Sequence, residues 1–190
     1  MKHVCCFILL LILCGCGDIP KQIREIKAHK LSVPKHELMT WSQDERYNAG
    51  ADATFLSLLF YVSENQCQSC FFHQLVTYER ENYESLADQG VRFVCIFSIK
   101  NIDIDILGSQ LQTNRIRGDV YIDTCGAFIL ANQHVPDNPL YHTFVIDNDG
   151  NILMVGNPFQ NSKMKHLFRK VIANAKQDQP QIRNHPQKMI

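Results

Sequence analysis

Two cysteines three positions apart, Cys67 and Cys70, are the residues whose types and spacing best suit chemistry. They follow an apolar run over residues 55–62 and open a helical pattern that ends near Gly90. The first N–H groups of a helix lack partners and the helix dipole places roughly +0.5 charge there, so a thiolate at Cys67 would be stabilised. Because Cys70 lies one turn further on, we predict that Cys67 attacks a substrate disulfide and that Cys70 resolves the mixed disulfide.

Other interpretations of the same pair stay open at this point. A Cys-x-x-Cys can supply half of a zinc site, but the sequence holds no second Cys-x-x-Cys and no His-x₃₋₅-His to complete tetrahedral ligation. The pair could also be a static structural disulfide, in which case the protein would be a redox-inactive interaction module. The position between an apolar strand and a helix favours thiol redox chemistry.

The elements that must position this pair follow from the apolar pattern. Residues 55–62 and 91–98 have the length and composition of strands buried on both faces, and a long helical stretch separates them. Two strands joined by a helix form a βαβ unit. We therefore expect the two strands to be parallel and the crossover to be right-handed.

The rest of the chain completes a layered α/β pattern. Asp149-Gly150 lies between two apolar runs, which predicts a β-hairpin over residues 143–155. Apolar residues at helical spacing predict a final helix around residues 164–172. The other expected elements are a helix over residues 101–116 and short strands over residues 38–41, 120–123 and 127–130.

The approach to Cys67 and Cys70 through Phe60-Tyr61-Val62, together with the ββα end and the segment from His142 to Ile152, resembles the thioredoxin fold. More narrowly, it is similar to TlpA/ResA-like lipoproteins and periplasmic thiol-disulfide oxidoreductases of Bacteroides-type bacteria. The resemblance implies an α/β, thioredoxin-like fold with a central mixed β-sheet flanked by helices, βαβ then ββα. It also implies a redox-active Cys67–Cys70 disulfide, electron exchange with dithiol or disulfide protein partners, and no bound cofactor or metal.

One position departs from the pattern of that family. The family has a cis-proline facing the cysteine pair, just before the strand that begins here near Thr143, and this sequence has Tyr141 or His142 there. We assign these two residues to the substrate side of the site or to proton transfer. With His142 beside Cys67 and Cys70, two soft thiolates and an imidazole would also suit copper, so a Sco-like copper-binding module is the leading alternative.

The N-terminal residues predict a targeting signal rather than a folded element. Ten apolar residues, Val4–Leu13, follow a basic head, and they are too few to span a hydrocarbon core of ~30 Å. Their length matches the apolar part of a secretory signal. The segment Leu13-Cys14-Gly15-Cys16 resembles the bacterial lipobox, which implies cleavage after Gly15 and lipidation of Cys16.

These patterns divide the chain into four parts. They are a lipoprotein signal peptide (1–15), a lipidated tether and approach segment (16–49), a thioredoxin-like domain (50–176) and a polar tail (177–190). We expect a lipid-anchored protein of the bacterial cell envelope that faces the periplasm. The 19 basic residues balance 19 acidic ones, which excludes a large basic surface for nucleic acid. Cys95 and Cys125 also stay in the mature chain, and a bridge between them is left open.

Overall fold

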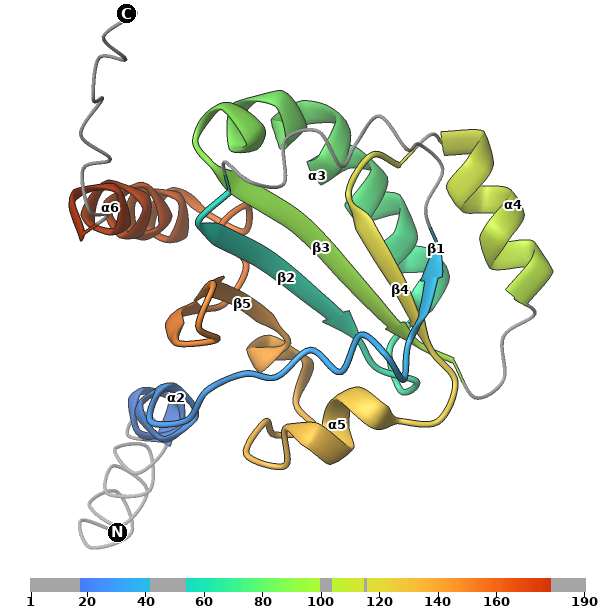
Figure 1. The fold of residues 1–190 in the computed structure, drawn as a ribbon, viewed down its shortest axis with the longest axis horizontal. Coiled ribbons are helices and arrows are strands. Elements are labelled where there is room, and N and C mark those ends of the chain that lie inside the picture. The colour runs from blue at the N-terminus through green and yellow to red at the C-terminus, as the bar shows by residue number, and fades with distance from the viewer. Residues whose placement is uncertain (1–17, 42–53, 100–103, 115, 179–190) are drawn as a thin grey trace, which may run out of the picture.

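The computed structural model describes residues 18–41, 54–99, 104–114 and 116–178, and its centre is a six-stranded mixed sheet in the order β1-β4-β3-β2-β5-β6 (Figure 1). The strands are β1 (Met39–Trp41), β2 (Leu56–Val62), β3 (Val91–Ser98), β4 (Asp119–Asp123), β5 (Thr143–Asp147) and β6 (Ile152–Val155). The helices are α2 (Asp18–Lys27), α3 (Gln68–Asp88), α4 (Ile104–Asn114), α5 (Ala127–Ala131), the short 3₁₀ turn η2 (Pro139–Tyr141) and α6 (Ser162–Asp178).

The middle of the sheet is parallel, as the βαβ pattern predicts. β2 pairs with β3 from Leu56 opposite Val91 to Val62 opposite Phe97, and β4 pairs in parallel on the other side of β3. The helices α3 and α4 are the crossovers that parallel strands require. The predicted hairpin is confirmed as β5 and β6. Of these, β5 pairs antiparallel with β2 and β6 pairs antiparallel with β5, while β1 pairs antiparallel with β4.

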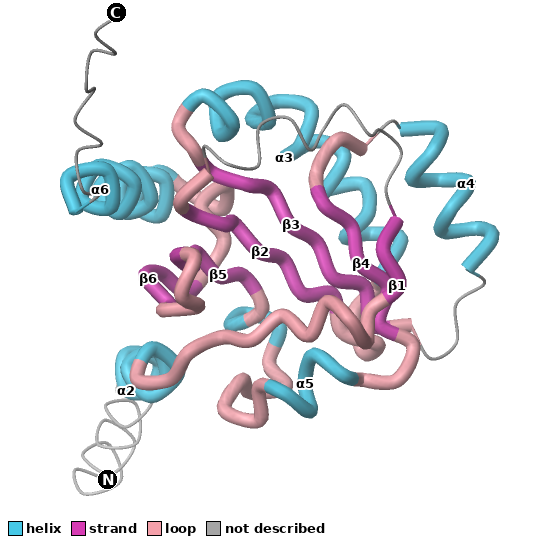
Figure 2. The backbone as a smooth tube through the Cα atoms, in the orientation of Figure 1, coloured by secondary structure: helices cyan, strands magenta, loops and turns pink. Residues whose placement is uncertain are grey.

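Alternate residues of β2 supply two apolar layers, one on each face of the sheet. Leu58 and Phe60 lie in the layer to which α3, α4 and α6 contribute, whereas Leu59 and Tyr61 lie in the layer to which α2 and α5 contribute. Figure 2 shows α3 and α4 on one side of the strands and α2 and α5 on the other. The two layers explain why β2 and β3 read as nearly continuous apolar runs.

The strand predicted over residues 127–130 is wrong, because these residues form helix α5. The cause is the carboxylate of Asp123 at the end of β4, which is 1% exposed. It accepts hydrogen bonds from the backbone N–H groups of Ala127 (2.9 Å) and Phe128 (3.0 Å). These groups would otherwise lack partners at the start of the helix, so the buried acid sets where α5 begins.

Residues 18–41, which belong to the predicted tether and approach segment, are folded against the sheet. The side chain of Ile26 in α2 is 1% exposed and that of Leu31 is 4% exposed, and both belong to the apolar layer on their face of the sheet. Lys30 forms an isolated antiparallel bridge with Asn151 beside the hairpin. The strand predicted near residues 38–41 is confirmed as β1. Burying these apolar side chains fixes residues 18–41 on the domain.

The chain ends fall outside the described residues. These parts include the predicted signal peptide, the predicted lipidation residue Cys16 and residues 179–190 of the predicted tail. Within the described ranges, no helix has the length and apolar character needed to cross a membrane.

The buried acid at the end of β4 makes a testable contribution to stability. Replacing Asp123 with Ala leaves the Ala127 and Phe128 N–H groups without their acceptor, so the free energy of unfolding should fall by about 1–3 kcal/mol. Urea unfolding followed by circular dichroism measures this change. Asp149→Ala, at an exposed hairpin position, is the matched control and should change stability by less than about 0.5 kcal/mol. Equal effects of the two substitutions would contradict the capping role.

Candidate active site

The two cysteines lie at the start of α3, where the sequence predicts them. Cys67 is the N-cap residue of this helix, and its Sγ accepts a hydrogen bond from the backbone N–H of Cys70 at 3.4 Å. The two side chains are joined as a disulfide, with Cα atoms 5.3 Å apart. Both residues are exposed. A backbone N–H group therefore already points at the sulfur that a reduced Cys67 would carry as a thiolate.

A small turn between β2 and α3 delivers Cys67 to this position. The side-chain Oε1 of Gln66 accepts a hydrogen bond from the backbone N–H of Ser63 at 2.8 Å, and the N–H of Gln66 donates to the carbonyl of Ser63 at 3.1 Å. These two bonds close residues 63–66 into one compact turn. The sequence shows this stretch only as a polar break, because a glutamine side chain that closes its own turn has no distinct pattern.

Aromatic packing holds the first turn of α3 against the sheet. The ring of Phe71, next to Cys70, lies 5.9 Å from the ring of Phe60 in β2 and 6.5 Å from that of Phe97 in β3. Aromatic pairs at such spacings add to the stabilisation that burial provides. The exposed disulfide is thus carried on a helix start that is itself fixed to the core.

His142 is buried just before β5, at 2% exposure. Its ring Nε2 lies 2.8 Å from the carbonyl oxygen of Pro136, and its ring packs edge-on to Tyr61 with centroids 5.0 Å apart. Since a carbonyl can only accept, Nε2 carries the proton and Nδ1 is the acceptor. Burial lowers the pKa of His142, and the Pro136 carbonyl and Asp137 oppose this shift. The ring is therefore neutral at pH 7.

Tyr141 is also buried, and its hydroxyl donates to the side-chain oxygen of Gln22 in α2. This hydrogen bond and the two contacts of the His142 ring do not involve the cysteine pair. The peptide bonds of the described residues are all trans, including those at Tyr141 and His142. The substrate-side and proton-transfer roles of both residues stay predictions.

The predicted copper ligands are not assembled. Cys67 and Cys70 are bonded to each other, and among the described residues no three His, Cys, Asp or Glu side chains converge to hold a metal ion. The imidazole of His142 instead uses Nε2 for the Pro136 carbonyl. Because thiolate ligands require the reduced pair, the Sco-like alternative stays a prediction.

The other two cysteines of the described residues, Cys95 and Cys125, do not form a bridge. Cys95 is free and buried in the middle of β3, and burial raises the pKa of its thiol well above the usual value, which suits an unreactive core residue. Cys125 is free and exposed after β4. The Cys95–Cys125 bridge that the sequence left open is absent from the structure.

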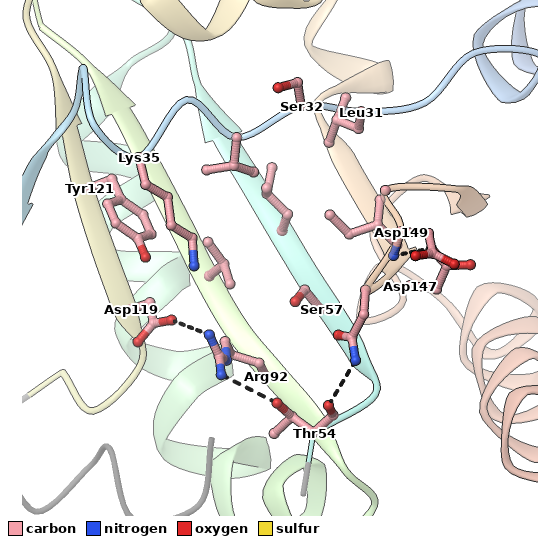
Figure 3. A pocket seen from close by; sticks show the side chains of 16 residues that line it. Leu31, Ser32, Lys35, Thr54, Ser57, Arg92, Asp119, Tyr121, Asp147 and Asp149 are labelled. Atoms are coloured by element: carbon pink, nitrogen blue, oxygen red, sulfur yellow. Dashed lines mark hydrogen bonds and ion pairs between the residues drawn. The ribbon is translucent and has the colours of Figure 1, made fainter. Parts of the chain in front are cut away.

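A large cavity lies at the opposite end of the parallel strands from the cysteines. It has a volume of about 570 Å³ and is covered by the segment that contains Leu31 and Lys35 (Figure 3). Arg92 in this cavity pairs with Asp119 at 3.5 Å and with the hydroxyl of Thr54 at 3.4 Å. Because β2 spans ~20 Å, this cavity is remote from Cys67 and offers no surface next to the disulfide.

Comparisons with known proteins give structural similarity at low sequence identity. No protein-family model matches the sequence, and no curated protein matches it significantly. A thioredoxin-like protein from Porphyromonas gingivalis is 20% identical, with a TM-score of 0.45, covering 70% of this chain and 81% of that one. The thioredoxin domain of a thiol-disulfide oxidoreductase from Bacteroides vulgatus is 12% identical (TM-score 0.47; coverage 76% and 98%). StoA from Bacillus subtilis is 14% identical (TM-score 0.44; coverage 60% and 82%).

The chain's own topology, rather than these similarities, defines its class. A parallel βαβ unit is followed by an antiparallel ββα unit in one mixed sheet with helices on both faces, and a Cys-x-x-Cys disulfide opens the helix after β2. This is a thioredoxin-like α/β domain, so the predicted fold class is confirmed.

The buried His142 predicts a specific dependence of stability on pH. Its folded-state pKa lies below the unfolded value of about 6.5, so the unfolded chain binds more protons as the pH falls. The contribution of neutral His142 to the free energy of unfolding is complete above about pH 6.5. It is lost as the pH falls towards the lower pKa of the folded state. Between about pH 7.5 and 5.5, His142→Gln should therefore lose less free energy of unfolding than the parent chain.

Urea unfolding at several pH values measures that difference. His166→Gln, on the exposed surface of α6, is the matched control and should retain the parent's pH dependence. A parent-like loss of stability in His142→Gln would show that the histidine titrates equally in both states and would contradict the neutral buried ring.

Proposed function

We propose that this protein is a membrane-anchored, extracytoplasmic thiol-disulfide oxidoreductase of the TlpA/ResA-like kind. The observation that carries the proposal is the exposed Cys67–Cys70 disulfide, with Cys67 as the N-cap residue of α3. An exposed disulfide at a helix start is accessible to an incoming thiolate, and the helix start favours the thiolate that its cleavage releases.

The exchange has two steps and needs only the two cysteines and a partner protein. In the reducing direction, the Cys67 thiolate attacks one sulfur of a partner disulfide, forms a mixed disulfide and expels the partner's other sulfur as a thiolate. The Cys70 thiol then loses its proton and attacks Cys67 Sγ, which re-forms the Cys67–Cys70 bond and releases the second partner thiol. A dithiol partner returns two electrons by the same steps in reverse.

Geometry supports Cys67 as the residue that forms the mixed disulfide. Its Sγ receives the N–H of Cys70 at 3.4 Å, and the hydroxyl of Ser69 lies 3.5 Å from the same atom. Both contacts stabilise negative charge on that sulfur. No cofactor, metal or nucleic acid takes part in this proposal, because the electrons come from partner thiols.

Exchange on the full-length chain tests the proposal. Cys67→Ser should reduce the rate of reduction of a disulfide-bonded substrate to the uncatalysed level, because the attacking sulfur is gone. Cys70→Ser should accumulate a mixed disulfide at Cys67, visible as an adduct on non-reducing gels and in peptide mass spectra. His73→Gln, exposed one turn after Cys70, is the matched control on the same helix.

A redox titration separates this proposal from a static disulfide. The Cys67–Cys70 pair, followed by alkylation of its peptide in glutathione buffers, should show a reversible couple above about −300 mV. A disulfide that stays closed below that value, together with parent-like exchange in Cys67→Ser, would refute the proposal and leave a redox-inactive interaction protein.

The membrane anchor rests on the sequence of the first sixteen residues. The short apolar run and Leu-Cys-Gly-Cys predict processing after Gly15 and acylation of Cys16. Cys16→Ser should therefore leave the chain unprocessed at this site and without acyl mass, as intact-mass spectrometry would show. Cys14→Ser, two residues away, should still be processed and acylated. If neither the parent nor the Cys14→Ser control is acylated, the membrane anchor is excluded. The redox proposal is unaffected by that result.

A further inference from the structure

At the carboxyl ends of the parallel strands, against the loop that leads to Cys67, lies a cavity of about 260 Å³. It is formed by the loop after β2, the end of β3, the turn after β4 and the residue before β5. The lining residues that matter for its chemistry are Tyr61, Glu64, Ser98, Cys125, Asp137 and His142. Clefts at this edge of an α/β sheet are the usual position for ligands.

Cys125 brings a free thiol to the wall of this cavity. The residue is exposed and not bonded to another cysteine. Its backbone N–H donates to the buried carboxylate of Asp123 at 3.2 Å, and its Sγ lies 3.9 Å from the same oxygen. The proposed exchange between Cys67 and Cys70 does not use this thiol.

The charges on the cavity wall are negative. Glu64 and Asp137 line it, whereas no Lys or Arg is among its described lining residues. Burial raises the pKa of the Tyr61 hydroxyl, and the negative charges of Asp123, Glu64 and Asp137 raise it further, against a hydrogen bond with Ser98. The two carboxylates that line the cavity, Glu64 and Asp137, therefore favour a cationic occupant.

A second observation points to the same kind of ligand. His142 is 2% exposed and lines the cavity, and its Nδ1 has no hydrogen-bond partner among the described residues. Since Nε2 donates to Pro136, Nδ1 is an acceptor that calls for an N–H or O–H donor. An ammonium group supplies both the positive charge that the carboxylates favour and the donor that Nδ1 lacks.

We propose that this cavity binds a small ammonium-bearing thiol and that Cys125 holds it as a mixed disulfide. The Cys125 thiol loses its proton to solvent, and the thiolate attacks one sulfur of a small cationic disulfide. A new bond forms between Cys125 Sγ and that sulfur while the reagent's S–S bond breaks. The second half leaves as a thiolate, takes up a proton and is the reduced product, whereas Cys125 is oxidised.

The size of the cavity restricts the occupant. At about 260 Å³, it is slightly smaller than typical drug-sized ligand sites. An aminothiol of a few heavy atoms fits this space better than a peptide thiol that carries carboxylates. The anionic ends of a peptide thiol would also face Glu64 and Asp137.

Three disulfides of similar size but different charge test the inference. Full-length protein in detergent, with Cys67–Cys70 oxidised, is mixed with cystamine (cationic), hydroxyethyl disulfide (neutral) or dithiodiglycolate (anionic). The adduct on the Cys125 peptide is followed by mass spectrometry. At low salt, cystamine should react at least about fivefold faster than dithiodiglycolate, and added salt should narrow the difference.

A charge-neutralised variant identifies the source of that preference. The double substitution Glu64→Gln and Asp137→Asn should remove most of the charge preference at Cys125. Asp149→Asn, which removes a carboxylate from the distant hairpin, is the matched control and should keep it. Both altered positions in the double variant are exposed, so the fold should survive and circular dichroism checks this.

Two results would overturn the inference. They are equal rates for the three reagents at Cys125, and an unchanged preference in the Glu64→Gln, Asp137→Asn variant. The result is independent of the proposed exchange at Cys67. A chain inactive in exchange that still loads Cys125 selectively loses only the proposed function, and an active chain with no selectivity at Cys125 loses only this inference.

Discussion

Parallel pairing of β2, β3 and β4 is the constraint on which the rest of the structure depends. Parallel strands cannot be joined by tight turns, so a helix must cross over after β2 and another after β3. All three strands then end at one edge of the sheet. The start of α3, the turn after β4 and the residue before β5 meet there. The side chains of Cys125 and His142 are therefore brought to one cavity by topology rather than by closeness in sequence.

The sequence predicts the elements whose patterns are long or chemically distinct. The runs over residues 55–62 and 91–98 favour strands buried on both faces, and Asp149-Gly150 indicates the hairpin. The five residues of α5 are too short to show a helical period, and the cap that defines them is the Asp123 carboxylate buried at the end of the preceding strand. Helix α2 does show apolar spacing at Ile19, Ile23 and Ile26, but its polar surroundings hide it.

The same distinction between local and non-local features applies to the residues of the site. The cysteine pair and its helix start are readable from Cys-x-x-Cys after an apolar strand, since both features are local. The surroundings of His142 are not local, because its burial depends on the Pro136 carbonyl and the Tyr61 ring. Residue types predict this histidine as a copper ligand beside the two sulfurs, and that role stays a prediction. Ligation needs three side chains to converge in space, which residue types alone cannot establish.

The early start of α2 has a mechanical consequence. The helix begins at Asp18 and its Ile26 is packed into the core, so it belongs to the rigid body that carries the disulfide. If Cys16 bears the proposed acyl chains, the backbone between anchor and helix can extend no more than about 7 Å. The domain would then be held close to the bilayer and could not move far above it. Any partner would then have to reach Cys67 close to the membrane surface.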